Sequence, residues 1–141
     1  MLYCKEGRLA ESRKQLEEAL GVFQSIGHLS KTAEVLSRLG DLDLIEDKQA
    51  EAEQHFLQSE ALVQKTGRSK TRAYNLLGLA RLKALQGDEA AAGPLAEQAR
   101  QLFRKLEIAD ESGEINELLR LIKAILNGIE EKKKPGGQDL I

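Results

Sequence analysis

The sequence predicts an all-α protein, an α-solenoid of antiparallel helical hairpins that ends in a capping helix. Small and apolar residues recur at a step of forty residues, and a fixed period of this size is typical of stacked repeats. The in-phase sets are Ala10, Ala50 and Ala90; Gly7, Asp47 and Gly87; Phe23, Val63 and Phe103; and Ala19, Ser59 and Ala99. Within each period, apolar residues follow helical spacing and polar or glycine-containing segments separate the helices.

The chain is predicted to begin inside a repeat. Residues 1–5 fit the last turn of a helix, and residues 8–26 form the next helix, so residues 1–27 make half a repeat. Gly27 then ends the helix, and Ser30 is placed to cap the following one. The chain is therefore either a fragment of a longer protein or one whose first repeat has shortened.

Two complete repeats follow, at residues 28–67 and 68–107. The first contains helices over 30–46 and 50–63, joined by a polar turn. The second contains helices over about 70–85 and 89–106, and Pro94 lies inside the latter, where we expect a kink or a late start. In each repeat a small residue, Gly40 or Ala80, stands where the two helices should touch.

A capping helix over residues 110–128 completes the predicted domain of residues 1–130. In this helix Arg120 stands at the repeat position that Gly40 occupies in the first complete repeat. A charged side chain is tolerable at this helix contact only where no second helix follows. Asn127-Gly128 is expected to end it, and residues 131–141 are charged and rich in helix breakers, as in a flexible tail.

The motif Leu36-x-x-Leu39-Gly40, followed by Ala52-x-x-x-Phe56, resembles the tetratricopeptide repeat, and residues 76–92 repeat it less closely. The resemblance implies a right-handed solenoid that binds proteins or peptides. The chain departs from the pattern in two ways. Its period is forty residues, against about thirty-four in the family. In addition, Asp43 and Lys83 stand where the family has an aromatic residue. It is therefore similar to a variant with longer helices.

Composition excludes several other classes. The net charge of −2 provides no basic stripe for nucleic acid or a membrane surface, and no apolar run reaches the length of a membrane span. A single cysteine, Cys4, fits a reducing compartment, so we expect a cytoplasmic protein. His28 and His55 lack partners at metal-ligand spacing, and there is no phosphate-binding glycine loop, so neither an enzyme nor a cofactor is predicted.

The concave side of the array is the predicted partner site, because the first helix of each repeat lines it. The candidate groove residues are Glu34, Ser37, Arg38, Asp41, Tyr74, Leu77, Arg81, Glu114, Glu117 and Leu121. The alternative is that Asp41 and Arg81 pair across neighbouring helices and Leu77 is a core residue. The paired lysines and asparagines with which some members of the family hold a peptide carboxylate are absent, since Ser37, Asp41, Leu77 and Arg81 stand in their places.

The leading functional prediction is a scaffold that binds a protein or peptide in this groove. A regulatory or sensory arm of a larger protein is the alternative, and self-association through an exposed helix 8–26 is a third. The acidic residues Asp41, Asp43, Glu46 and Asp47 are interpreted as a solvated face, and the basic segment 65–72 as a soluble connector that could also hold an anion. The sequence names no partner, because repeat surfaces vary on a fixed scaffold.

Overall fold

Six helices make up the described structure, a computed structural model that describes residues 6–67, 69–107 and 114–133. The helices are α1 (Glu6–Ser25), α2 (Leu29–Ile45), α3 (Gln49–Thr66), α4 (Ser69–Leu85), α5 (Glu89–Glu107) and α6 (Glu114–Lys133). Within these ranges there is no strand. The all-α prediction is confirmed. The predicted last turn at residues 1–5 and most of the predicted tail lie outside the described residues.

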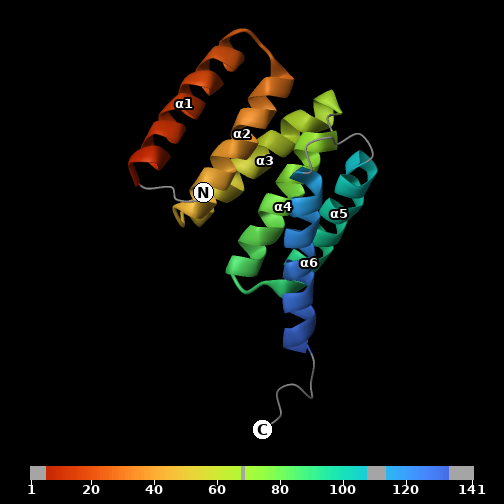
Figure 1. Cartoon of the computed structure of the whole chain (residues 1–141). Helices are drawn as coiled ribbons and strands as arrows, with labels where there is room; N and C mark the ends of the chain where they lie inside the picture. Colours follow the sequence, from red (N-terminus) through yellow and green to blue (C-terminus); the bar gives the residue numbers. More distant parts are fainter. Residues whose placement is uncertain (1–5, 68, 108–113, 134–141) are drawn as a thin grey trace.

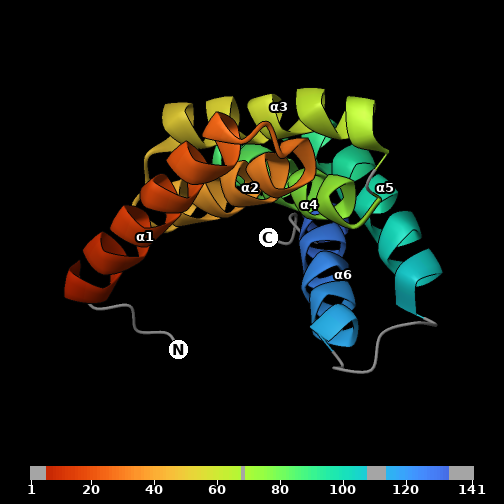
Figure 2. The ribbon, with the colours of Figure 1, turned by 90° about the horizontal axis from the view of Figure 1, so that it is seen from above.

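Each helix packs against the next one along the chain, as in a helical solenoid. In addition, α2 contacts α4 and α4 contacts α6, so the first helices of successive repeats form a continuous row. Figure 2 shows the result as an arch, with α3 along its outer side, α2 and α4 beneath it, α1 descending at one end and α5 and α6 descending towards the other. The inner side of this arch is where α2 and α4 present side chains that α3 and α5 do not cover.

Left-handed residues end the helices at a regular step. Gly27, Asp47, Gly67 and Gly87 all have positive φ, between 61° and 78°. At three of these ends the backbone closes with the paired hydrogen bonds of a Schellman motif, as where Lys48 N–H donates to the Asp43 carbonyl at 2.8 Å and Asp47 N–H to the Leu44 carbonyl at 3.1 Å. The twenty-residue spacing explains the sequence period: each repeat is two helices of similar length with a left-handed stop after each.

Phe56 of α3 is the centre of the fold, because its ring lies between two glycines on different helices. A Cβ atom added at Gly40 of α2 would lie 2.7 Å from the Phe56 ring, and one added at Gly78 of α4 would also overlap it. Phe56 is fully buried and packs with Ala52, Leu44 and Leu82. The predicted close approach at Gly40 is confirmed. Gly78 forms the other wall of the Phe56 site.

A second apolar cluster joins α4, α5 and α6. Phe103 is fully buried there, together with Ala96 and Ala99 of α5 and Ile122 of α6. Small residues on α5 let the helices approach, and Asp88 caps the start of α5 by accepting from the Ala91 N–H at 3.2 Å. Since α5 continues unbroken through Pro94, the predicted late start is wrong.

A buried ionic network connects α1, α2 and α3. Asp43 of α2 is fully buried, and it accepts from Arg13 Nη2 of α1 at 2.8 Å while its other oxygen lies 2.5 Å from His55 Nδ1 of α3. Arg13 also donates to Glu46 at 2.9 Å. Burial opposes the charge on Arg13, but the hydrogen bonds that Arg13 donates to the Asp43 and Glu46 carboxylates, with the negative charges of these groups, outweigh that effect and raise the Arg13 pKa. The interpretation of Asp43 as part of a solvated acidic face is therefore wrong.

A polar chain also crosses the interior between α2, α3 and α4. The Ser59 hydroxyl donates to the Ala33 carbonyl at 2.6 Å, and the Asn75 amide donates to Ser59 Oγ at 2.9 Å. Both side chains are fully buried, and these hydrogen bonds offset part of the cost of removing them from water, while the Asn75 side-chain oxygen has no partner among the described residues. This explains why a serine, Ser59, stands where the repeat phase places Ala19 and Ala99.

Three local expectations are corrected by the structure. The cap of α2 is His28, whose Nδ1 accepts from the Lys31 N–H at 3.2 Å, and Ser30 lies inside the helix. Gly7 lies inside α1, so the turn position shared by Asp47 and Gly87 does not extend to it. The capping helix passes through Asn127-Gly128 to Lys133, because the added turn places Ile129 in a buried position near Gly93 of α5. The predicted start at residue 110 lies outside the described residues.

Candidate functional site

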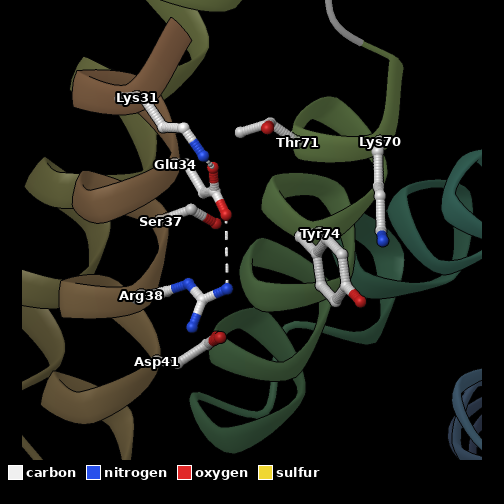
Figure 3. A pocket seen from close by; sticks show the side chains of 8 residues that line it. All are labelled: Lys31, Glu34, Ser37, Arg38, Asp41, Lys70, Thr71 and Tyr74. Carbon is white, nitrogen blue, oxygen red and sulfur yellow. Dashed lines mark hydrogen bonds and ion pairs between the residues drawn. The ribbon is translucent and has the colours of Figure 1, made fainter. Parts of the chain in front are cut away.

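A cavity of about 420 Å³ lies between α2 and α4, the first helices of two successive repeats. Figure 3 shows side chains of α2 on one side and of α4 on the other. The lining residues are Lys31, Glu34, Ser37, Arg38, Asp41, Lys70, Thr71 and Tyr74. Because α2 and α4 belong to different repeats, the cavity exists only through the stacking of the repeats.

Helical geometry brings the lining residues together. On α2 the charged residues Lys31, Glu34, Arg38 and Asp41 follow one another at steps of three or four, which places them on one face. On α4, Lys70 and Thr71 lie one turn before Tyr74. The hydroxyl-bearing Ser37 and Thr71 are buried, whereas the lysines and Arg38 are exposed. The cavity therefore has a rim of exposed cations around a more buried interior.

Glu34 holds two of the rim cations. Its carboxylate lies 3.5 Å from Lys31 Nζ and 3.3 Å from Arg38 Nη2, the second contact being the dashed line in Figure 3. All three side chains are at least one-third exposed, and such pairs contribute little to stability. A charged group of a partner can therefore replace one member of these ion pairs at a low cost in free energy.

Asp41 is the unusual ionisable group of the site. Burial raises its pKa from 3.8 to about 6, and the nearby positive charges of Arg81 and Arg38 offset only part of that rise. Its carboxylate points into the cavity next to Arg38 (Figure 3). A partly desolvated carboxyl of this kind gains from a hydrogen-bond donor or cation supplied by a ligand.

Tyr74 connects the cavity to the core. Its ring meets the ring of buried Phe103 edge to face, with centroids 5.3 Å apart and an interplanar angle of 83°. One edge of Tyr74 therefore belongs to the cluster between α4 and α5 while the side chain also lines the cavity. This anchoring fixes the ring in place and lowers the entropy lost when a partner packs on it.

The structure brings five of the ten predicted groove residues together at this cavity: Glu34, Ser37, Arg38, Asp41 and Tyr74. Arg81 is not a lining residue, but its charge acts on Asp41 across the two helices, as the alternative interpretation expected.

Leu77 is a correction to the predicted groove. It is 4% exposed and belongs to the apolar cluster that α4 shares with α5 and α6, so it is a core residue. The reason is the packing of both α5 and α6 against α4, since the cluster around Leu77 includes Phe103 of α5 and Ile122 of α6.

The predicted residues of the last helix are separate from the cavity. Glu117 is exposed and pairs with Arg120 on its own helix at 2.7 Å, and Leu121 is exposed as well. Glu114 is the first residue of α6, and its side chain lies outside the described part of the chain. The cavity is therefore lined by residues of α2 and α4, and the predicted residues of α6 do not contribute to it.

Sequence reasoning missed three lining residues, Lys31, Lys70 and Thr71. The spacing contained a signal for each of them, since Lys31 precedes Glu34 by three residues and Lys70 and Thr71 precede Tyr74 by four and three. They were overlooked because the stripe was started one turn too late on both helices. Lys70 had been assigned to a basic connector.

Other site types find no support within the described residues. Across residues 6–67, 69–107 and 114–133, no three His, Cys, Asp or Glu side chains come together as ligands for a metal ion. None of the helices in the same ranges combines the length and apolar character needed to cross a membrane. Cys4 lies outside the described residues.

Comparison with known proteins adds one finding. The family model of the tetratricopeptide repeat matches residues 1–65, a stretch that contains α1, α2 and most of α3. No curated protein and no solved structure matches the chain. The matched stretch includes the motif from Leu36 to Phe56 that the sequence analysis singled out. The segment of residues 1–65, slightly less than half of the chain, is therefore similar to tetratricopeptide repeats, as the motif predicted.

Proposed function

We propose that the protein is a binding scaffold that holds an extended segment of a protein partner in the cavity between α2 and α4. Tetratricopeptide repeats generally mediate protein–protein interaction, and the family is a non-catalytic scaffold. The observation that carries the proposal is the cavity itself, which two successive repeats build from opposite sides. Binding without chemical turnover is accordingly the activity proposed here.

The lining chemistry suits a peptide. A volume of about 420 Å³ falls within the usual range of ligand sites, about 300–1,000 Å³. Cations, carboxylates and hydroxyls of both helices offer donors and acceptors to a peptide backbone, and Tyr74 offers an aromatic surface. Tyr and Arg are the residue types that most often dominate the binding energy of protein interfaces.

A selection from a random peptide library on the purified chain tests this. Arg38→Glu and Lys70→Glu reverse exposed rim charges, and Tyr74→Phe removes the hydroxyl while keeping the contact with Phe103. We expect each charge reversal to weaken the selected peptides at least about fivefold, the equivalent of about 1 kcal/mol at a central interface residue.

Lys65→Glu on α3 is the matched control, because Lys65 is exposed and does not line the cavity. Binding that survives Arg38→Glu and Lys70→Glu but is lost in Lys65→Glu would contradict the proposal and place the working surface on α3. The same measurements apply if the chain is the regulatory arm of a larger protein, since the proposed surface is the same.

A second candidate is association of two copies through α1. Val22 on this helix and Ile26 directly after its last residue are 56% and 66% exposed, and the α1 residues Leu9, Leu16, Leu20 and Phe23 are only half-buried. Exposed apolar side chains on one helix favour contact between molecules. Light scattering over a concentration series should show a rising mass for the wild type and less association for Val22→Glu with Ile26→Glu. A strict monomer at high concentration would contradict this candidate.

A further inference from the structure

A second cleft, of about 490 Å³, lies between α5 and α6 and shares no lining residue with the cavity between α2 and α4. It is lined by Arg100, Arg104, Asn116, Leu119, Arg120 and Lys123. The two helices lie side by side at the C-terminal end of the array (Figure 1). Among its described lining residues there are four cations and no carboxylate, in a chain whose net charge is −2.

Helix spacing concentrates the charge. Arg100 and Arg104 are four residues apart on α5, and Arg120 and Lys123 are three apart on α6, so each pair lies on one helix face. Like charges at these spacings on one helix repel each other and disfavour the helix. Arg104 in the last turn of α5 gains from the helix dipole, but Arg120 and Lys123 lie in the middle of α6, where the dipole offers no such gain.

The charges of the cleft are only partly balanced. Arg100 pairs with Glu97 on its own helix, and Arg120 pairs with Glu117 at 2.7 Å. Arg104 and Lys123 have no ion pair within the described residues. Among the described residues, two positive charges therefore have no ion-pair partner, one on each wall of the cleft.

We propose that the cleft between α5 and α6 binds a phosphorylated side chain of a protein partner. A phosphoserine or phosphothreonine carries a charge of about −1.5 to −2 at neutral pH. This matches the two cleft cations Arg104 and Lys123, which have no ion pair within the described part of the chain. A guanidinium binds phosphate oxygens in bidentate fashion, and the Asn116 amide supplies a further donor. Leu119 provides an apolar contact for the segment that carries the phosphate.

Charge balance also selects among sources of phosphate. A nucleic acid or an anionic membrane binds through many phosphates along an extended basic surface. Here four cations line one cleft of a molecule whose net charge is −2, so a single phosphate group on a peptide fits it. The proposal is independent of the cavity between α2 and α4, and a partner with a phosphorylated segment could occupy both.

The probe is a degenerate peptide library with a fixed central phosphothreonine, compared by fluorescence anisotropy with the same library carrying threonine. We expect the phosphorylated set to bind at least tenfold more tightly. The double variant Arg104→Gln with Lys123→Gln should lose that difference, whereas Lys14→Gln with Lys65→Gln, which removes the same charge from exposed sites on α1 and α3, should keep it.

Folding gives a second readout. Because Arg104→Gln and Lys123→Gln relieve like-charge contacts, the double variant should melt at the wild-type temperature or slightly above it. Equal binding of the two libraries would overturn the proposal. So would unchanged phosphopeptide binding by the double variant, or tighter binding of single-stranded polynucleotide or of phosphatidylserine vesicles than of the phosphopeptides.

Discussion

The junction of α1 with α2 and the junction of α3 with α4 join the same kinds of helix forty residues apart, yet different interactions stabilise them. In the first, Arg13 and Asp43 form a pair at 2.8 Å, and in the second, Glu53 and Lys83 lie 3.5 Å apart. Residues 13 and 53 are in phase, as are 43 and 83, so the two pairs occupy the same register with their charges exchanged. The Asp43 side chain is 1% exposed, against 40% for Glu53.

The two junctions also differ in their apolar packing, which is extensive between α3 and α4 and small between α1 and α2. The second junction contains Phe56 between Gly40 and Gly78, and Leu82 of α4 is fully buried beside it. From Arg8 to Ser25, by contrast, no α1 side chain is buried. Where one junction is stabilised by an aromatic ring, the other depends on an arginine and a carboxylate.

The exchanged charges also distinguish the repeats from each other. If α1 were to pack against α4 in place of α3, Arg13 would meet Lys83, and if α3 took the place of α1, Glu53 would meet Asp43. Both arrangements bring like charges together at a close contact, which disfavours the wrong pairing. Repeats of similar sequence thus have an electrostatic means of keeping their order.

The largest effect is expected from breaking the aromatic junction. Phe56→Ala removes a fully buried ring that contacts α2, α3 and α4, and such truncations cost about 3–5 kcal/mol of the free energy of unfolding. Urea denaturation measures this. Phe23→Ala, at a half-buried position on α1, is the matched control and should cost much less. Equal losses in the two variants would contradict the difference between the junctions.

Next in size is the loss of the buried charge pair. Arg13→Ala leaves the Asp43 carboxylate buried with His55 as its remaining partner, and removal of one member of a buried pair costs about 3–5 kcal/mol. Because Arg13 itself is 20% exposed, we expect the lower end of this range. Amide hydrogen exchange should accelerate along α1 in particular. A loss below about 1 kcal/mol, as expected for the exposed Lys14→Ala, would show that α1 is held by other contacts.

Sequence reasoning reached the fold through features that repeat and missed those that do not. The left-handed stops near Gly27, Asp47, Gly67 and Gly87 and the close approach at Gly40 follow from local rules of helix ends and small residues. Asp43 looked like a surface residue because its partner Arg13 lies thirty residues away, and no local pattern reveals a buried pair of that separation. In the candidate site, the α2 stripe was predictable from helical spacing, whereas the burial of Leu77 depends on how α6 packs.

A smaller effect concerns the carboxyl in the cavity. The folded Asp41 has a pKa of about 6 against 3.8 in the unfolded chain, so the folded state binds the proton more tightly. The stability that this proton provides is present below pH 4 and is lost as the pH rises through 6. At about 1.4 kcal/mol per pKa unit, the upper limit is on the order of 3 kcal/mol, and solvent screening makes it smaller.

Asp41→Asn tests this because the amide does not ionise. The variant should be more stable than the wild type at pH 7.5 and no more stable at pH 4, as measured by urea denaturation at both values. Glu51→Gln on α3, an exposed carboxylate, is the control and should show no such change with pH. A constant difference between Asp41→Asn and wild type from pH 4 to 7.5 would contradict the raised pKa.

The smallest effect is expected at the second ion pair, and it sharpens the contrast between the junctions. Glu53 and Lys83 are 40% and 25% exposed, and exposed pairs contribute about 0.2–1 kcal/mol. A double-mutant cycle with Glu53→Gln and Lys83→Met measures their coupling in isolation, and the cycle with Arg13→Met and Asp43→Asn gives the counterpart for the first junction. We expect the first coupling energy to exceed the second at least twofold, because burial of Asp43 lowers the screening of its charge. Equal coupling energies for the two pairs would contradict this, because they would show that the burial of Asp43 does not strengthen its ion pair with Arg13.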